Sequence, residues 1–314
     1  MRPAYSVIIF TTASGAGYGL LVWLALTALF HGPTANRWFA AAGFLLALAL
    51  ITAGLVSSTF HLGRPERAWR AFSQWRSSWL SREGVFSIAT YPAAILFGAL
   101  WLQLMPWPAA LFPAALLTIL LCIVTVYCTA KIYSSLPTIP QWRDPLVDIG
   151  YLVLSLATGA VLLALLAALF GLNAPVIGRL AAGSLIAAAI CKLVYWRRID
   201  AAPHRFTIGQ ATGLGSLGSV RQWEPPHTGE NFVMKEMGYN IARKHSARLR
   251  NNVIAALPMA AATILAASLV TGALAVALGV VAVICAGLGV LIERWLFFAE
   301  ARHVSMLYYG APVA

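Results

Sequence analysis

Charged residues are scarce in this chain. Asp, Glu, Lys and Arg make up only 10% of its 314 residues, whereas 60% of the residues are hydrophobic. A water-soluble domain carries about 25% charged residues to cover its apolar core. The composition therefore excludes a soluble globular protein and predicts an integral membrane protein.

Cysteine is also rare, and metal-binding patterns are missing. None of the four cysteines forms a Cys-x-x-Cys pair, which argues against a disulfide framework, a zinc site or an iron–sulfur cluster held by this chain. The six histidines fall in loops or at the ends of apolar runs, whereas a haem between membrane helices needs histidines in mid-helix. We therefore expect no haem and no metal site.

Long uncharged runs dominate the rest of the sequence. One membrane crossing needs about 20 apolar residues. Two uncharged runs, residues 84–130 and 253–292, are about twice that length, and each is predicted to form two helices. The turns between these helices are expected at Pro106-Trp-Pro108 and at Thr271-Gly272. The prediction is an all-α integral membrane protein with a single transmembrane domain, residues 1–314, and a polar loop at 198–250. We expect no ionisable residue inside the helices. The expected helices are residues 6–30, 38–60, 84–104, 109–130, 149–170, 175–196, 253–270 and 273–298.

Positive charge is concentrated at one end of this arrangement. Of the 22 Lys and Arg residues, all except Arg37 and Arg179 fall on the side that carries both termini. The positive-inside rule places that side in the cytoplasm. We expect a multi-pass protein of the bacterial inner membrane with both termini cytoplasmic and with polar partners on that face. The net charge of +12 does not indicate nucleic-acid binding, because the cations flank apolar spans.

The polar loop contains a glycine motif that we do not interpret as a nucleotide site. Gly213-Leu-Gly-Ser-Leu-Gly218 matches G-x-G-x-x-G, but no β-strand pattern precedes it and no βαβ unit fits. We expect an ordered loop that packs against a partner subunit. The basic run 243–250 is expected to anchor the next helix beside anionic lipid head groups.

The bridge between the second and third predicted helices, residues 61–83, is the most polar short segment. It contains five arginines between His61 and Glu83. We expect Ser81 to cap the third helix and Glu83 to lie in its first turn. If the bridge folds back, His61 and Glu83 approach each other at the membrane surface, with Arg64 and Arg67 nearby.

Such a site would suit a quinone, because its reduction moves two protons with two electrons. A quinone site needs an apolar slot for the ring, a histidine that hydrogen-bonds one carbonyl oxygen of the quinone and an acid that relays protons to it. From these residues alone, another interpretation stays open. His61 would then only close a helix, Glu83 would stabilise a helix start, and the arginines would follow the inside rule.

The bridge resembles a known family. His61-Leu-Gly-x-Pro65 followed by Arg67-Ala68, and then Ser81-x-Glu83, resembles the anchor subunit of the dimethyl sulfoxide reductase type, among the membrane subunits of molybdenum oxidoreductases. The loop motifs Ala211-Thr-Gly-Leu-Gly215 and Pro226-His-Thr-Gly-Glu-Asn231 resemble the branch of cytoplasmic sulfite dehydrogenases.

The resemblance implies a haem-free, eight-helix anchor that binds quinone (ubiquinone or menaquinone). It also implies a four-cluster iron–sulfur subunit and a molybdopterin catalytic subunit on the cytoplasmic face, which hold the metal cofactors. The family's quinone residues carry over to His61, Arg67 and Glu83, with His61 and Glu83 as the catalytic pair. Arg64, Trp79, Ser81 and Arg82 are added only because they are adjacent.

The predicted function is therefore the quinone-binding, electron-transferring anchor of a sulfite:quinone oxidoreductase. One alternative is the anchor of a dimethyl sulfoxide reductase-like enzyme that oxidises quinol. Alternatives of another class are an eight-helix transporter, disfavoured by helix interiors without charge, and a purely structural tether.

Overall fold

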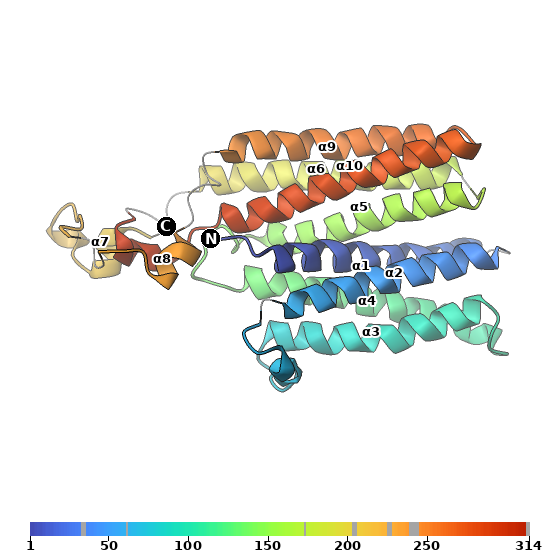
Figure 1. Cartoon of the computed structure of the whole chain (residues 1–314), viewed down its shortest axis with the longest axis horizontal. Helices are drawn as coiled ribbons and strands as arrows, with labels where there is room; N and C mark the ends of the chain where they lie inside the picture. The colour runs from blue at the N-terminus through green and yellow to red at the C-terminus, as the bar shows by residue number, and fades with distance from the viewer. Residues whose placement is uncertain are drawn as a thin grey trace.

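The chain forms a bundle of long helices (Figure 1). The computed structural model describes residues 1–32, 36–60, 62–172, 174–202, 206–224, 228–238 and 245–311. Within these ranges, eight helices are long and apolar enough to cross a membrane, so the all-α membrane fold is confirmed. They are α1 (Tyr5–His31), α2 (Arg37–Thr59), α3 (Trp79–Trp101), α4 (Leu111–Ser134), α5 (Pro145–Leu169), α6 (Pro175–Ala201), α9 (Ser246–Ser268) and α10 (Gly272–Ala299).

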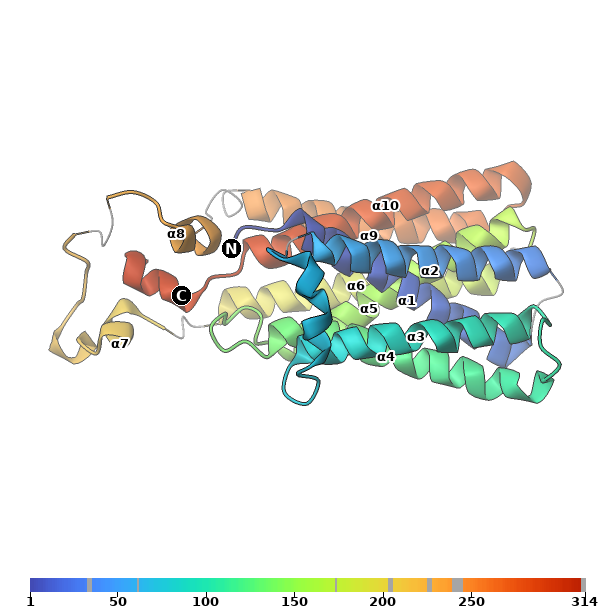
Figure 2. The same cartoon turned by 60° about the horizontal axis from the view of Figure 1, so that its bottom comes forward.

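Short helices lie in the connections. The bridge from α2 to α3 crosses one end of the bundle, and the two termini, α7 and α8 project from that same end (Figure 2). We call it the polar end. The short helices are η1 (Pro65–Phe72), η2 (Pro108–Ala110), α7 (Ile208–Thr212), η3 (Gly215–Leu217), α8 (Phe232–Met237) and η5 (Val304–Tyr309).

Several helices extend further than the apolar runs predicted. α3 begins at Trp79 and not at residue 84, α9 begins at Ser246 and not at 253, and α6 continues to Ala201 and not only to 196. The prediction ended each helix where the first charged residue appeared, but membrane helices can continue beyond the hydrocarbon core of the bilayer. Their ends depend on caps such as Ser78, whose side chain accepts the N–H of Ser81 (3.4 Å).

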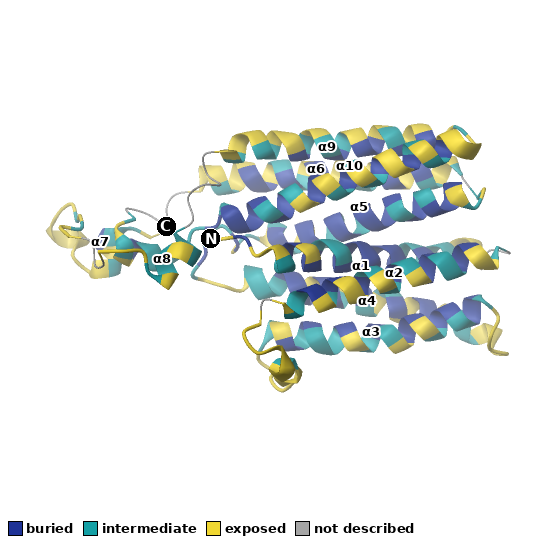
Figure 3. Ribbon diagram, in the orientation of Figure 1, coloured by how far each residue is buried: buried dark blue, intermediate teal, exposed yellow. Residues whose placement is uncertain are grey.

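Helix α1 lies inside the bundle, against α2, α4, α5 and α10, and its residues and those of α5 are largely buried (Figure 3). The small residues of α1 allow this. A Cβ on Gly19 would clash with the Ser155 carbonyl oxygen, and one on Gly159 would clash with the α1 backbone. The Ser155 hydroxyl donates to the Gly15 carbonyl (2.6 Å). The lack of side chains at these positions therefore lets α1 and α5 pack closely.

Segments from distant parts of the sequence meet at the polar end. The N–H of Arg2 donates to the carbonyl of Glu236 (2.7 Å), and the N–H of Val304 donates to that of Thr138 (3.0 Å). In the glycine motif, Gly213 ends α7 with a positive φ of 72°, so its first glycine serves as a helix cap. The polar loop is thus tied to the chain ends.

The expectation that the helix interiors hold no ionisable residue is wrong. Lys192 in α6, Glu293 and Arg294 in α10 and Glu83 in α3 are all buried. Burying a charge is costly unless it is paired, so each of these groups needs a structural or functional reason.

Candidate functional site

The start of α3 is tied to the bridge by the side chains that the sequence places there. Ser78 is the N-cap of α3, so the expectation that Ser81 caps this helix is wrong. The Ser81 hydroxyl instead donates to the carbonyl of Ala71 in η1. This contact holds η1 against the first turns of α3.

Two further contacts fix the bridge. A Cβ on Gly84 would lie 2.9 Å from the Phe72 ring, so the absence of a side chain lets η1 approach α3 closely. The Arg82 guanidinium donates to the carbonyl oxygens of Trp75 (3.0 Å) and Arg76 (2.6 Å) and lies 4.3 Å from the centre of the Trp79 ring. Arg82 and Trp79 therefore position the bridge.

Glu83 is the buried acid beneath this bridge. Only 5% of its surface is exposed, and it lies in the second turn of α3 rather than in the first, because the helix begins at Trp79. Its Oε1 accepts a hydrogen bond of 2.5 Å from the hydroxyl of Thr129 in α4. Among the described residues, no cation forms an ion pair with it. A carboxyl held by a hydroxyl alone can exchange a proton without breaking an ion pair.

The predicted arginines lie on the outer surface of the bridge. Arg64 and Arg67 are exposed, and the nearest acid to Arg67 is its neighbour Glu66, with Nε 4.0 Å from Oε1. Within the described part of the chain, Arg67 and Glu83 form no ion pair. His61 lies outside the described residues. Trp79, Ser81 and Glu83 thus lie in the first two turns of α3 but contact different partners, and both arginines lie on the surface of the bridge.

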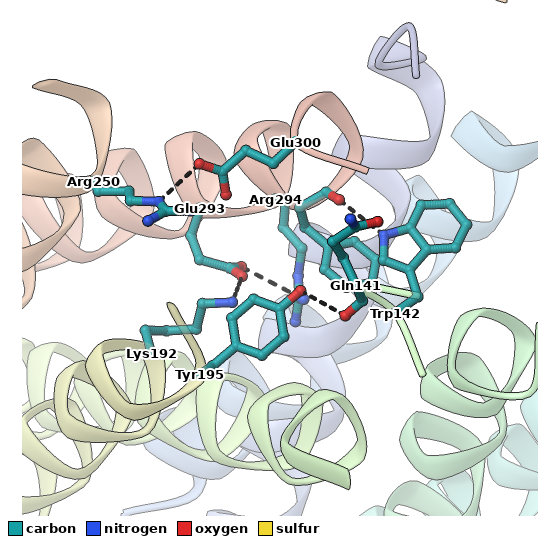
Figure 4. A network of polar contacts seen from close by, with 9 residues as sticks. Gln141, Trp142, Lys192, Tyr195, Arg250, Glu293, Arg294 and Glu300 are labelled. Carbon is teal, nitrogen blue, oxygen red and sulfur yellow. Dashed lines mark hydrogen bonds and ion pairs between the residues drawn. The ribbon is translucent and has the colours of Figure 1, made fainter. Parts of the chain in front are cut away.

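A second group of charges lies inside the bundle between α6 and α10 (Figure 4). Lys192 Nζ is 2.6 Å from Glu293 Oε1, and Arg294 Nη1 is 3.4 Å from Glu293 Oε2. These two contacts are ion pairs, but their geometry is not that of hydrogen bonds to the Glu293 carboxylate oxygens. The Arg294 guanidinium lies 3.6 Å from the centre of the Tyr151 ring, and the Lys192 ammonium 4.0 Å from that of Tyr195. We call Lys192, Glu293 and Arg294 the interior cluster.

A surface network adjoins the interior cluster. Arg250 in α9 binds Glu300 (2.7 Å) and Asp200 (2.5 Å), and the Asp200 side chain is 58% exposed. Both Arg250 and Lys192 lie against the ring of Trp196, at 5.4 Å and 5.3 Å from its centre. The interior cluster is therefore one aromatic ring away from water at the polar end.

A cavity of about 710 Å³ lies at the opposite end, between α1, α2, α5 and α6. Its lining is apolar apart from Trp23, Thr27 and His31, and His31 is the one titratable side chain among its lining residues. This composition suits an acyl chain better than a reaction that moves two protons. Among the described residues, no group of three or more His, Cys, Asp or Glu could hold a metal ion.

Sequence patterns alone missed two features of the site. The interior cluster had a visible signal, since Lys192 lies in the predicted helix 175–196 and Glu293 and Arg294 lie in 273–298. Thr129 had no such signal, because a threonine near a helix end is unremarkable until its partner on another helix is known.

The bundle with its polar end defines a multi-pass membrane protein. The sequence matches the family described as DMSO reductase anchor subunit (DmsC) over residues 1–300. It is also 35% identical to a sulfite dehydrogenase subunit of Allochromatium vinosum, over an alignment of 329 residues that covers 98% of this chain and 99% of that protein. The chain belongs to the DMSO reductase anchor subunit family. It is thus the membrane anchor of a molybdenum oxidoreductase, and the family resemblance found in the sequence is confirmed.

Proposed function

We propose that this chain binds quinone beneath the bridge and passes electrons to it from an iron–sulfur partner, as the anchor of a sulfite:quinone oxidoreductase. The observation that carries the proposal is Glu83, a buried carboxyl held by Thr129 at the polar end of α3. Aromatic rings of Phe72, Trp79 and Tyr127 lie around this helix start. A flat, mostly apolar quinone diffusing in the lipid would meet these surfaces first.

Electrons and protons balance between the two half-reactions. Oxidation of sulfite with water to sulfate releases two electrons and two protons at the molybdopterin site of the partner. Reduction of quinone to quinol consumes two electrons and two protons in this chain. Glu83 would deliver one of these protons to a quinone oxygen and then be reprotonated. His61, carried over from the family motif, would hydrogen-bond the other oxygen.

The exposed face of the bridge is the proposed docking surface for the iron–sulfur partner. Arg64, Arg67, Arg70 and Arg76 are exposed there, together with Trp69 and Trp75. Arginine and tryptophan are the residues most enriched at the centres of protein interfaces. A partner seated on this surface would bring its last cluster above Glu83. The partner and its molybdopterin subunit would lie in the cytoplasm, below a bacterial inner membrane.

The direction of electron flow follows from the molybdopterin partner. The name of the relative from Allochromatium vinosum supports sulfite as the electron donor, with quinone as the acceptor. In a quinol-oxidising enzyme of the dimethyl sulfoxide reductase type, Glu83 would take a proton from quinol rather than give one. The family match leaves the eight-helix transporter without support.

Glu83→Gln in the complete complex tests the proposal. The amide keeps the shape and accepts the Thr129 hydrogen bond, but it cannot deliver a proton, so quinone-dependent sulfite oxidation should fall at least about 100-fold. Subunits should still copurify, and sulfite oxidation with ferricyanide, which draws electrons from the water-soluble subunits, should be unchanged. The matched control is Glu230→Gln, an exposed glutamate of the polar loop. Normal quinone turnover by Glu83→Gln would refute the site.

A further inference from the structure

Polar side chains that the proposed mechanism does not use lie between Glu83 and the interior cluster. They line a cavity of about 10 Å³, roughly the size that holds one water. Thr129, the partner of Glu83, forms part of its wall on one side, and Arg294 of the interior cluster forms part of its wall on another. The cavity thus adjoins both ionisable sites.

The atoms around this cavity are unusual in having no hydrogen-bond partner in the described part of the chain. They are the hydroxyl oxygens of Thr12 and Tyr151 and Nε of Arg294. The residues Tyr151 and Arg294 are each 3% exposed. Buried polar atoms are almost always hydrogen-bonded, to protein or to ordered water. A water in this cavity would satisfy several of them at once.

A second cavity of about 10 Å³ continues towards α6. Lys192 and Glu293 contribute to its wall, and Tyr151 and Arg294 line both cavities. Tyr151 lines the first cavity together with Thr129, the partner of Glu83, and its ring lies 3.6 Å from the Arg294 guanidinium. Tyr151 is therefore the side chain between the two ionisable sites.

On the far side of the interior cluster, the Lys192 side chain is 7% exposed, and a surface network lies beyond the ring of Trp196. Lys192 and Arg250 share the ring of Trp196, and Arg250 binds the exposed carboxylate of Asp200. Asp200 lies on α6, whereas the bridge joins α2 to α3. The polar end of α6 and the bridge lie apart from each other at this end of the bundle (Figure 2).

We infer that the two cavities, with their water, and the Tyr151 hydroxyl form an internal proton path that joins Glu83 to Lys192 of the interior cluster. The inference rests on the proposed function of Glu83. When Glu83 gives its proton to a quinone oxygen, the Thr129 hydroxyl passes a proton to the carboxylate and regains one from the cavity water. That water regains a proton through the Tyr151 hydroxyl from the Lys192 ammonium, which lines the second cavity and leaves the Glu293–Arg294 ion pair in place when it gives up its proton. Lys192, whose side chain is 7% exposed, then takes a proton from water at the polar end, so one proton is taken up for each proton delivered.

The other members of the path have fixed roles. Arg294 stays charged under all ordinary conditions and orients water. The Glu293 carboxylate holds the Lys192 ammonium in place through the 2.6 Å ion pair. Such a path is useful because an iron–sulfur partner on the bridge would cover the direct route between Glu83 and water. Both ends of the path are at the polar end, so it moves no net charge across the membrane.

Tyr151→Phe in the complete complex tests the path, since it deletes one hydroxyl that no other protein group in the described part of the chain binds. The matched control is Tyr133→Phe, whose ring stacks on Tyr151 (centroids 5.9 Å apart) without lining either cavity. For Tyr151→Phe we expect kcat with quinone to fall about tenfold, equivalent to about 1.4 kcal/mol in the barrier. The KM for quinone should stay unchanged, and the solvent isotope effect in D2O should rise. The control should match the wild type in all three.

The outcomes separate this inference from the proposed function. Wild-type kcat and isotope effect in Tyr151→Phe would overturn the path, as would a loss of ferricyanide-dependent activity, which would show a structural role. If Tyr151→Phe does not assemble, Thr12→Val, which removes another hydroxyl of the same cavity that has no partner among the described residues, takes its place with the same expectations. Normal quinone turnover by Glu83→Gln would instead refute the quinone site itself.

Discussion

The hydroxyl of Thr129 lies 2.5 Å from Oε1 of Glu83 and donates a hydrogen bond to it across the contact between α4 and α3. The same hydroxyl also contacts the carbonyl of Thr125 (3.1 Å). The position of the buried acid is therefore set by a helix 46 residues further along the chain. A proposed proton donor that is held this way can change its protonation state while its orientation is kept.

Thr129→Val should lower quinone-dependent kcat about tenfold, because the isosteric side chain cannot hold the Glu83 carboxyl in place. The free energy of unfolding should fall by about 1–3 kcal/mol, the usual cost of leaving a buried polar group without its partner. Thr129→Ser, which keeps the hydroxyl, should restore most of the kcat. Steady-state kinetics with quinone and thermal unfolding check both effects. Equal loss in the valine and serine variants would contradict the role of the hydroxyl.

Glu293→Gln should strongly destabilise the chain. It leaves the two buried cations Lys192 and Arg294 without an anion, and breaking a buried ion pair costs about 3–5 kcal/mol. Adding Lys192→Met removes one of these cations and should recover a large part of the loss. The double-mutant cycle is measured as unfolding temperatures of the purified complex. Additive losses in the double variant would show that Lys192 and Glu293 are not coupled.

The attachment of η5 should depend on pH through His303. Its Nδ1 accepts the N–H of Ser305 (3.1 Å), and burial, with the nearby terminal ammonium of Met1, lowers the pKa of His303 below its ordinary value of 6.5. The folded state therefore resists protonation, so the stability is full above pH 6.5 and is lost as the pH falls through 6.5 towards the lower folded pKa.

Hydrogen exchange of residues 304–309 measured between about pH 8 and about pH 5 checks this expectation. Exchange corrected for its intrinsic pH dependence should rise towards the acidic end. In His303→Asn, whose amide oxygen can also accept the Ser305 N–H but does not titrate, it should stay flat. A flat profile in the wild type would contradict a role for His303 in the attachment of η5.

Labelling with a membrane-impermeant maleimide should place the bridge in the cytoplasm. In a background without native cysteines, Ser73→Cys on the bridge should react only after the cells are opened. Leu104→Cys, which is 71% exposed at the other end of the bundle, should react in intact cells. The reverse pattern would place the proposed docking surface outside the cell.

The eight helices could be predicted from sequence because the length of an apolar run is local information. The ends of these helices could not be predicted, because a helix can continue beyond the hydrocarbon core and begins or ends where its terminal backbone groups are capped. The Ser78 side chain and the Asp144 side chain, which accepts the N–H of Leu146 (2.8 Å), begin helices before the apolar runs do. Sequence alone does not reveal which of several polar residues acts as the cap.

The candidate site was predictable only in part. The motif predicted Glu83 as a site residue, and the structure buries its side chain near the start of α3, where only 5% of it is exposed. The roles of Ser81 and Arg82 as ties to the bridge could not be read from the motif, because their acceptors are backbone carbonyls. Nor could the pairing of Lys192 with Glu293, which depends on how α6 and α10 face each other.

The contacts at the polar end also constrain how the protein is made. Arg2 meets Glu236, and Gln141 Oε1 accepts the N–H of Arg302 (3.0 Å), so this surface joins segments on either side of the eight membrane helices. A nascent chain halted after α9 has its first helices in the membrane but lacks Arg302 and η5, which complete the surface. The polar end therefore takes its final form only after α10 and η5 have been made.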